Sequence, residues 1–215
     1  MTDIFQEVDE EIRRDRMMVL WRRYGAYIVA IAVLLIGAVA AYEGWQAWQR
    51  RQAAADAASF AAAERLARDS KPAEAAAAFQ KLAAEGTVGY RALAGLRAAG
   101  SYAEAGDQAQ AVALYERLAG DSSVPARYRE LASLMAAYQR MDEADPAELR
   151  RRLEPLAADG PWRHVARELL ALAVLRSGDR AGAEKALTEV ADDPAAPAGS
   201  RARAAELLAA LKAGQ

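Results

Sequence analysis

The sequence predicts an all-α protein in which a single N-terminal transmembrane helix is followed by a solenoid of about four helical hairpins and a capping helix. Three observations predict this fold class: a run of 19 residues without a charge, 57 alanines among 215 residues, and a motif that recurs at intervals of 34 to 38 residues. Alanine has the highest helix propensity, and strand-favouring β-branched residues are scarce outside the apolar run. We expect a cytoplasmic amphipathic tail (1–23), the transmembrane helix (24–42), a juxtamembrane helical linker (43–56) and the helical-repeat domain (57–215).

Composition excludes several classes of function. The 28 basic and 30 acidic residues are well mixed and leave a net charge of −2, so we expect no nucleic-acid partner. Cysteine is absent, and any histidine-based metal site or catalytic triad would need His164, the one histidine. No Gly-rich phosphate loop follows a strand, and paired carboxylates lack a pocket around them. We therefore expect a protein that is not an enzyme, with no cofactor, no metal and no small-molecule substrate.

The apolar run from Tyr24 to Tyr42 is long enough to cross a membrane. Nineteen residues at about 1.5 Å of rise per residue span a hydrocarbon core of about 30 Å. Aromatic rings, which favour the lipid headgroup layer, stand at both ends of the run. The expected membrane-interface anchors are Trp21, Arg22, Arg23, Tyr24, Tyr42, Trp45 and Trp48. The alternative, a buried core helix of a soluble protein, would not need aromatic residues at both ends.

The distribution of arginines predicts the orientation of this span. Five arginines lie between residues 13 and 23, whereas only Arg50 and Arg51 follow the run closely. Positive residues stay on the cytoplasmic side, so we expect a cytoplasmic N-terminus and a repeat domain on the far side, which is the periplasm in a Gram-negative bacterium. A cleaved signal peptide is the alternative, because residues 38–40 have the small-x-small form of a cleavage site. The long acidic tail and the length of the apolar run argue against it.

The rest of the chain repeats a helical motif. Small or apolar residues recur at positions i, i+4 and i+7 in four segments, which begin at Ala75, Ala111, Leu149 and Ala183. Three of these segments have an aspartate four residues earlier that is expected to cap the helix, and glycines directly precede two of the aspartates. The aspartates are Asp107, Asp145 and Asp179, and the glycines are Gly106 and Gly178. A period near 34 residues with an Ala-x3-[Phe/Tyr] core is the tetratricopeptide repeat (TPR) pattern.

Two parts of the array are expected to be irregular. Pro155 lies in the third motif helix, next to three consecutive arginines (150–152), so this helix is expected to be short or kinked. The last helix, roughly Ser200 to Lys212, has no partner after it and is expected to cap the array.

The stacked hairpins are expected to leave a curved surface lined by the first helix of each pair, where such arrays bind peptides or partner domains. Aromatic residues with neighbouring arginines are the candidates for this partner groove, although each aromatic ring could instead wedge adjacent repeats together. The candidate residues are Tyr90, Arg91, Tyr102, Tyr128, Arg129, Tyr138, Trp162 and Arg163.

Two stretches carry a resemblance to a known family. They are GTVGYRALAGLRAAGSYAEAGDQAQAVALYERLA, from Gly86, and GPWRHVARELLALAVLRSGDRAGAEKALTEV, from Gly160. With the tail, the span and the terminal helix, they resemble the ancillary SecYEG translocon subunit family, the YfgM-type membrane-anchored TPR proteins, over nearly the whole chain.

This resemblance implies a single-pass protein of the bacterial inner membrane with a periplasmic C-terminal domain. Its implied partners are the SecYEG translocon and a PpiD-type periplasmic chaperone, and its implied role is to help pass emerging polypeptides to soluble chaperones. No catalytic residue is implied. The alternative is a periplasmic TPR scaffold in envelope or cell-division coordination, similar to CpoB-type proteins, which have a cleaved signal sequence.

Overall fold

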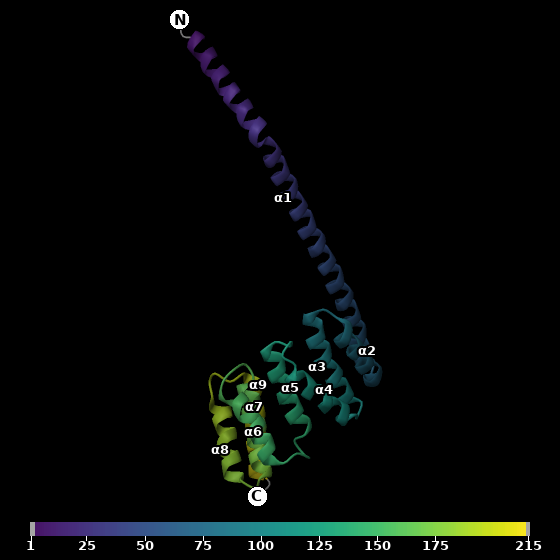
Figure 1. Cartoon of the computed structure of the whole chain (residues 1–215). Helices are drawn as coiled ribbons and strands as arrows, with labels where there is room; N and C mark the ends of the chain where they lie inside the picture. Colours follow the sequence, from purple (N-terminus) through teal and green to yellow (C-terminus); the bar gives the residue numbers. More distant parts are fainter. Residues whose placement is uncertain (1–2, 214–215) are drawn as a thin grey trace. The chain divides into compact units, whose positions relative to one another are not determined.

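The computed structural model describes residues 3–213, which form nine α-helices and no strand (Figure 1). The helices are α1 (Asp3–Arg68), α2 (Pro72–Glu85), α3 (Val88–Glu104), α4 (Gln108–Gly120), α5 (Ala126–Gln139), α6 (Pro146–Ala158), α7 (Arg163–Arg176), α8 (Arg180–Asp192) and α9 (Ala198–Ala213). The chain divides into two compact units, Met1–Ala54 and Ala55–Gln215, which are described separately. The all-α prediction is confirmed.

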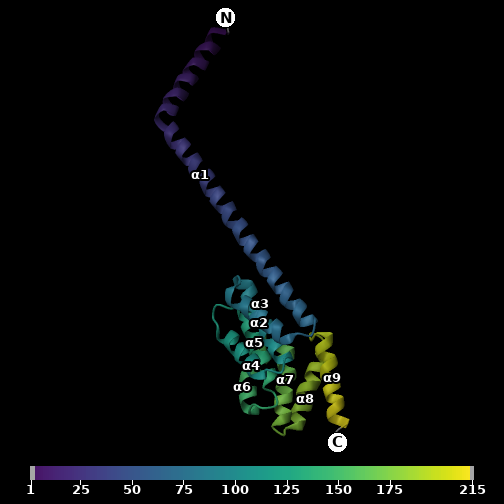
Figure 2. The ribbon, with the colours of Figure 1, turned by 90° about the vertical axis from the view of Figure 1, so that its right-hand side faces the viewer.

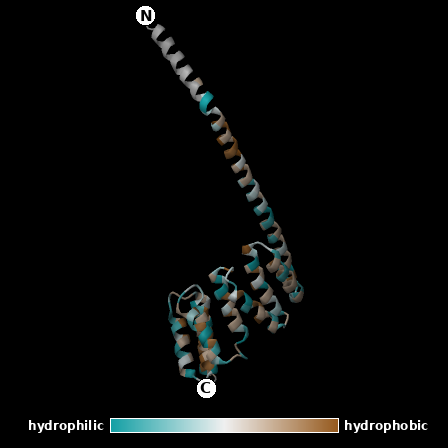
Figure 3. Cartoon of the chain, viewed as in Figure 1, coloured by the Kyte–Doolittle hydropathy of each residue, from teal (hydrophilic) through white to brown (hydrophobic). Residues whose placement is uncertain are grey.

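The first unit is the N-terminal part of α1. Within the described residues, α1 is the one helix that is long and apolar enough to cross a membrane, judged by length and composition. Its apolar side chains are uncovered, with Leu34 71% and Ile36 70% exposed. Figure 3 shows hydrophobic residues gathered in the middle of α1. The side chains of residues 1–17 lie outside the described part, so the amphipathic face of the tail stays a prediction, as do the boundaries between tail, span and linker.

The second unit is a stack of antiparallel helix pairs. The end of α1, from Ala55, pairs with α2, and the following pairs are α3 with α4, α5 with α6, and α7 with α8 (Figures 1 and 2). Each pair packs on the next, and α9 packs on α8 and α7. Four hairpins and a capping helix are therefore present, as predicted, with α9 beginning slightly before the expected residue.

The repeated motif forms the core of this stack. Ten of its twelve anchor positions are buried, and Phe79, Leu153 and Leu187 are 1% exposed or less. Fully buried alanines on the first helices, such as Ala98 beside Phe79 and Ala171 beside Leu187, face them. A methyl group at these positions lets neighbouring helices approach closely without leaving voids. The buried alanines therefore serve tight helix packing.

The three predicted aspartate caps are confirmed. The Oδ1 atoms of these residues accept hydrogen bonds from backbone N–H groups two or three residues later, which would otherwise lack a partner. The pairs are Asp107 with Gln110 at 3.1 Å, Asp145 with Ala147 at 3.0 Å, and Asp179 with Gly182 at 2.8 Å. Gly106 and Gly178 adopt φ of +84° and +91°, the left-handed conformation expected where the preceding helix ends.

Pro155 does not shorten the third motif helix, and the alternative expectation of a kink stays a prediction. Helix α6 contains Pro155 and has 13 residues, the same length as α4 and α8. Proline removes the hydrogen bond to the carbonyl group four residues earlier, that of Arg151. Both residues are exposed, so water can satisfy the Arg151 carbonyl oxygen. The helix therefore tolerates proline on its solvent side.

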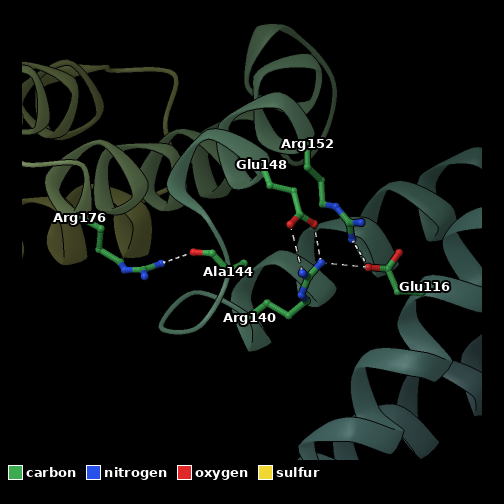
Figure 4. A network of polar contacts seen from close by, with 6 residues as sticks. All are labelled: Glu116, Arg140, Ala144, Glu148, Arg152 and Arg176. Atoms are coloured by element: carbon green, nitrogen blue, oxygen red, sulfur yellow. Dashed lines mark hydrogen bonds and ion pairs between the residues drawn. The ribbon is translucent and has the colours of Figure 1, made fainter.

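A polar network joins the third pair to the helices on either side of it (Figure 4). Arg140, at the end of α5, donates to both carboxylate oxygens of Glu148 at 2.6 and 3.2 Å, and Arg152 donates to Glu116 of α4 at 2.6 Å. Arg176 of α7 donates to the carbonyl oxygen of Ala144 at 2.9 Å. The hydrogen bond from Arg140 is the main cause that lowers the pKa of Glu148. These contacts fix the α5–α6 turn between the second and fourth pairs.

Candidate partner-binding groove

An apolar groove runs across the first helices of the last two pairs and the capping helix. Its lining residues recur at helical spacing on α5, α7 and α9, so that one stripe of each helix faces the groove. They are Leu134, Met135 and Tyr138 of α5; Val165, Glu168, Leu169 and Leu172 of α7; and Arg203, Glu206, Leu207 and Ala210 of α9. We call this set the α5–α7–α9 groove.

The groove has a buried floor and open walls. Leu134 and Leu169 are 3% and 6% exposed and belong to the core cluster between α5, α6 and α7. Leu172 and Leu207 are half-buried, and the Tyr138 ring is 55% exposed. The groove volume is about 600 Å³. A solvent-accessible apolar groove of this volume is well suited to the side chains of a partner segment.

One ion pair forms the polar edge of the groove. Glu168 is 5% exposed, and both of its carboxylate oxygens accept hydrogen bonds from Arg203, at 2.9 and 3.2 Å. Arg203 also donates to the Ser200 hydroxyl at 3.2 Å. The hydrogen bond to Glu168 and its negative charge raise the pKa of Arg203. The buried carboxylate is therefore neutralised within the protein, and exposed Glu206 is the one remaining charge along the lining.

The groove is not accompanied by a cluster of metal-binding side chains in the described part of the chain. Across the described residues, no group of three or more His, Cys, Asp or Glu side chains could hold a metal ion. His164 is 5% exposed and lies at the start of α7, where its Nδ1 is 3.6 Å from Asp193 Oδ2. The lining of the groove is suited to binding.

One of the sequence-predicted aromatic residues, Tyr138, lines the groove. Tyr90 lies instead beside Phe60 at the first pair, with ring centroids 6.0 Å apart. The Tyr102 hydroxyl donates to Gln80 of α2 at 2.8 Å. These two residues connect neighbouring helices, which is the wedge arrangement weighed above.

The other candidates lie at the N-terminal ends of first helices or beside a second cleft. The Trp162 indole N–H donates to the Arg127 carbonyl oxygen at 2.9 Å, and the Tyr128 ring lies 5.1 Å from the Arg127 guanidinium. Arg163 donates to the carbonyl oxygen of Gly160 at 3.1 Å, and half-buried Arg129 lies on α5 near its start. Arg91 lines a cleft between α2, α3 and α4. A role of these residues in partner binding stays a prediction.

The seven expected membrane-interface anchors are all exposed on α1. Trp45 and Trp48 stack one helical turn apart with centroids 5.2 Å apart, and the Arg23 guanidinium lies 5.8 Å from the Tyr24 ring. Trp21 covers Gly25, the one buried residue among 21–42. Their placement at a lipid interface stays a prediction.

Sequence reasoning missed the aliphatic residues of the groove. Val165, Leu169 and Leu172 on α7 and the stripe at 203, 206, 207 and 210 on α9 do recur at helical spacing. The same spacing of apolar residues also occurs on helix faces that are buried in a core. The sequence alone does not show whether another helix covers this face.

The fold and the groove define a class of protein: an all-helical solenoid of stacked hairpins that offers one of its faces to a protein partner. A family model described as a tetratricopeptide repeat-like domain matches residues 19–134, more than half of the chain, and the chain belongs to this family. Domains built from such repeats mediate binding to protein partners, and the fold is that of a scaffold.

Two solved structures show a similar fold. They are crystal structures of nearly identical TPR-like repeats from Podosopora anserina, in a protein assigned as a kinesin light chain. The first is a Q17M form. Their sequences are 18% and 19% identical to this chain. Their TM-scores are 0.56 and 0.55, and each match covers 73% of this chain and 84% of the other. At this identity the likeness shows the fold alone. No curated protein matches the sequence.

Proposed function

We propose that this chain is a single-pass scaffold of the bacterial inner membrane, with its N-terminus in the cytoplasm and its repeat domain in the periplasm. The α5–α7–α9 groove carries the proposal, because it presents about 600 Å³ of mostly apolar space on a repeat fold whose relatives bind proteins. By the resemblance described above, the scaffold links the SecYEG translocon to a PpiD-type chaperone. It acts by holding a partner segment and performs no chemistry on it.

The membrane placement rests on α1. Apolar side chains across 24–42 are uncovered in the first unit, and burying them in lipid is strongly favourable at about 25 cal/mol per Å² of apolar surface. Aromatic residues flank this stretch and arginines concentrate before it, which supports a span with a cytoplasmic N-terminus. The same helix continues into the first repeat, so the anchor and the scaffold share one element.

The groove's chemistry indicates what the partner offers. Leu134, Leu169, Leu172 and Leu207 present branched aliphatic surface, and the one carboxylate buried there is already paired. A partner segment with aliphatic side chains on one face would bury them against these residues without leaving a buried charge unpaired.

The topology is tested by cysteine labelling, which suits a chain without native cysteine. The reporter cysteine must be accessible to the reagent. Ala202 of α9 is exposed, whereas Ser200 of the same helix is only 3% exposed, so Ala202 is the position chosen. A membrane-impermeant maleimide should label Ala202→Cys in intact cells and should label Thr2→Cys only after lysis. Labelling of Thr2→Cys alone in intact cells would reverse the orientation, and a soluble mature form that begins near Ala41 would establish a cleaved signal peptide.

The groove is tested by site-specific photocrosslinking in membranes. A photoreactive residue at Tyr138 should crosslink a translocon subunit or a periplasmic chaperone, whereas one at exposed Ala126, on the same helix but outside the groove lining, should not. The groove variant Tyr138→Glu should abolish co-purification of that partner, and the matched variant Ala126→Glu should retain it. Equal crosslinking from both positions, or partners of the division machinery instead, would refute the proposed role.

A further inference from the structure

A second cleft lies on a different set of helices. It has a volume of about 360 Å³ and is bounded by α2, α3, α4 and the turn at 121–124. Its apolar surface includes half-buried Leu114 and Leu118 and Val88, which is 59% exposed. Gly95 lies at its base, where an added Cβ would come within 3.0 Å of the Leu118 side chain. We call it the α2–α3–α4 cleft.

Two arginines border this cleft and form no ion pair within the described residues. Arg91 of α3 and Arg117 of α4 are both exposed, and within residues 3–213 neither side chain forms an ion pair or a hydrogen bond. The carboxylate on the lining, Asp121, is held by Ser123, whose N–H and hydroxyl donate to Asp121 Oδ1 at 2.9 and 2.7 Å. These hydrogen bonds, and then the positive charges of Arg91 and Arg117, hold the pKa of Asp121 below its usual range.

The chain contains an internal comparison for this cleft. A cleft of about 300 Å³ lies between α6, α7 and α8, and the repeated motif aligns its lining with that of the α2–α3–α4 cleft. At the position of Arg117 it has Glu189, and at the position of Gln80 it has Glu154. Because the same place in the fold accepts a glutamate, packing of the repeat does not require an arginine there. The arginine at position 117 is therefore free to serve a purpose other than packing.

We propose that the α2–α3–α4 cleft is a second docking surface, which binds an acidic segment of a protein partner. Arg91 and Arg117 hold a carboxylate of the segment, and Val88, Leu114 and Leu118 receive a neighbouring aliphatic side chain.

The charge of the cleft selects this partner. Guanidinium groups bind carboxylates through paired, charge-assisted hydrogen bonds, and two of them can hold one acidic residue from both sides. Apolar surface beside them favours a segment in which acidic and aliphatic residues alternate over a polyanion of acidic residues alone. The chain would then bind two partners through two chemically different surfaces, one apolar and one basic.

The test uses the full-length chain in detergent micelles and a fluorescein-labelled probe peptide of about eight residues in which Asp and Leu alternate, long enough to cross two helices. Fluorescence anisotropy should show binding that is at least about tenfold tighter than that of the same peptide with Asn in place of Asp. The double variant Arg91→Gln/Arg117→Gln should lose this preference for Asp.

The control removes two positive charges elsewhere. Arg201 and Lys212 are exposed on α9 and make no ion pair within the described residues, so Arg201→Gln/Lys212→Gln should bind the Asp peptide as the native chain does. A separate variant, Arg117→Glu, copies the natural residue of the α6–α7–α8 cleft; it should melt at the native temperature and fail to bind. Equal affinity for the Asp and Asn peptides, or an equal loss in the α9 control, would overturn the proposal. Tyr138→Glu should leave peptide binding unchanged, which separates this test from that of the proposed function.

Discussion

Arg203 of α9 holds the buried carboxylate of Glu168 of α7 with two hydrogen bonds, 2.9 and 3.2 Å long. The pair joins the capping helix to the last hairpin and lies along the α5–α7–α9 groove. The pair is unequally covered, since the side chain alone is 7% exposed for Glu168 and 54% exposed for Arg203. The pair therefore stabilises the fold mainly by giving the buried Glu168 carboxylate a charged hydrogen-bond donor.

Removing the arginine of this pair should destabilise the repeat domain. Arg203→Ala leaves a buried carboxylate without its charged partner, which costs about 1–3 kcal/mol of unfolding free energy. Urea denaturation measured by circular dichroism would show it as a lower transition midpoint. Arg201→Ala, on the exposed side of the same helix, should stay within about 0.5 kcal/mol of the native chain. Equal stability of the two variants would contradict a role for the pair.

The aspartate caps should each contribute measurably to stability. Asp179→Ala removes the acceptor for the Gly182 backbone N–H and should lower the free energy of unfolding by about 1 kcal/mol. Asp192→Ala is the matched control, because this exposed aspartate ends the same helix and accepts no hydrogen bond in the described residues. Thermal melts of both variants give the comparison, and a larger effect at Asp192 would disprove the capping role.

A single methyl group should distinguish two glycines of the second hairpin. Gly106 has φ of +84° and open space around its Cα, so Gly106→Ala should cost about 1–2 kcal/mol from backbone strain alone. Gly120 also has open space but lies within α4 with an ordinary φ, so Gly120→Ala should be neutral or slightly stabilising. Denaturant midpoints of the two variants should move in different directions or by clearly different amounts.

Alkaline pH should weaken the domain through Tyr115. Burial raises the pKa of this phenol, so the folded protein keeps its proton at a pH where the unfolded chain loses it. Stability from this residue is therefore complete below the unfolded-state pKa of about 10 and falls as the pH rises above it. Tyr115→Phe lacks this term, and the native chain should lose unfolding free energy relative to that variant between about pH 9 and 11. Parallel stability curves over this range would refute the prediction.

Features that depend on local chemistry could be predicted from the sequence. The anchor spacing located the buried faces of α2, α4, α6 and α8, and Asp107 and Asp179 marked helix starts, because a cap needs only a side chain three residues from a backbone N–H. The long apolar helix was also evident from composition, since its residues need no tertiary partner to be recognised.

Features that depend on how the helices stack could not be predicted from the sequence. Leu172 and Leu207 look like core residues in the sequence, and only the arrangement of α5, α7 and α9 leaves them half-buried beside a groove. The contacts of Tyr90 with Phe60 and of Tyr102 with Gln80 likewise could not be predicted, because the sequence does not show which side of a first helix meets its neighbour. The effect of Pro155 on the length of α6 was hard to predict for a related reason. It depends on whether the carbonyl oxygen that the proline leaves unpaired faces water.

Gly95 lies where the Leu118 side chain of α4 comes closest to the backbone of α3 in the α2–α3–α4 cleft. An added Cβ would lie only 3.0 Å from the Leu118 side chain, so this side chain packs closely against the backbone of α3. Arg167 stands among the lining residues of the equivalent cleft, so a longer side chain is compatible with that part of the fold. A larger residue at position 95 would push α4 away from α3 and so change the distance between Arg91 and Arg117. The size of residue 95 would then affect which acidic segments the two arginines can bind, without changing the charge of the surface.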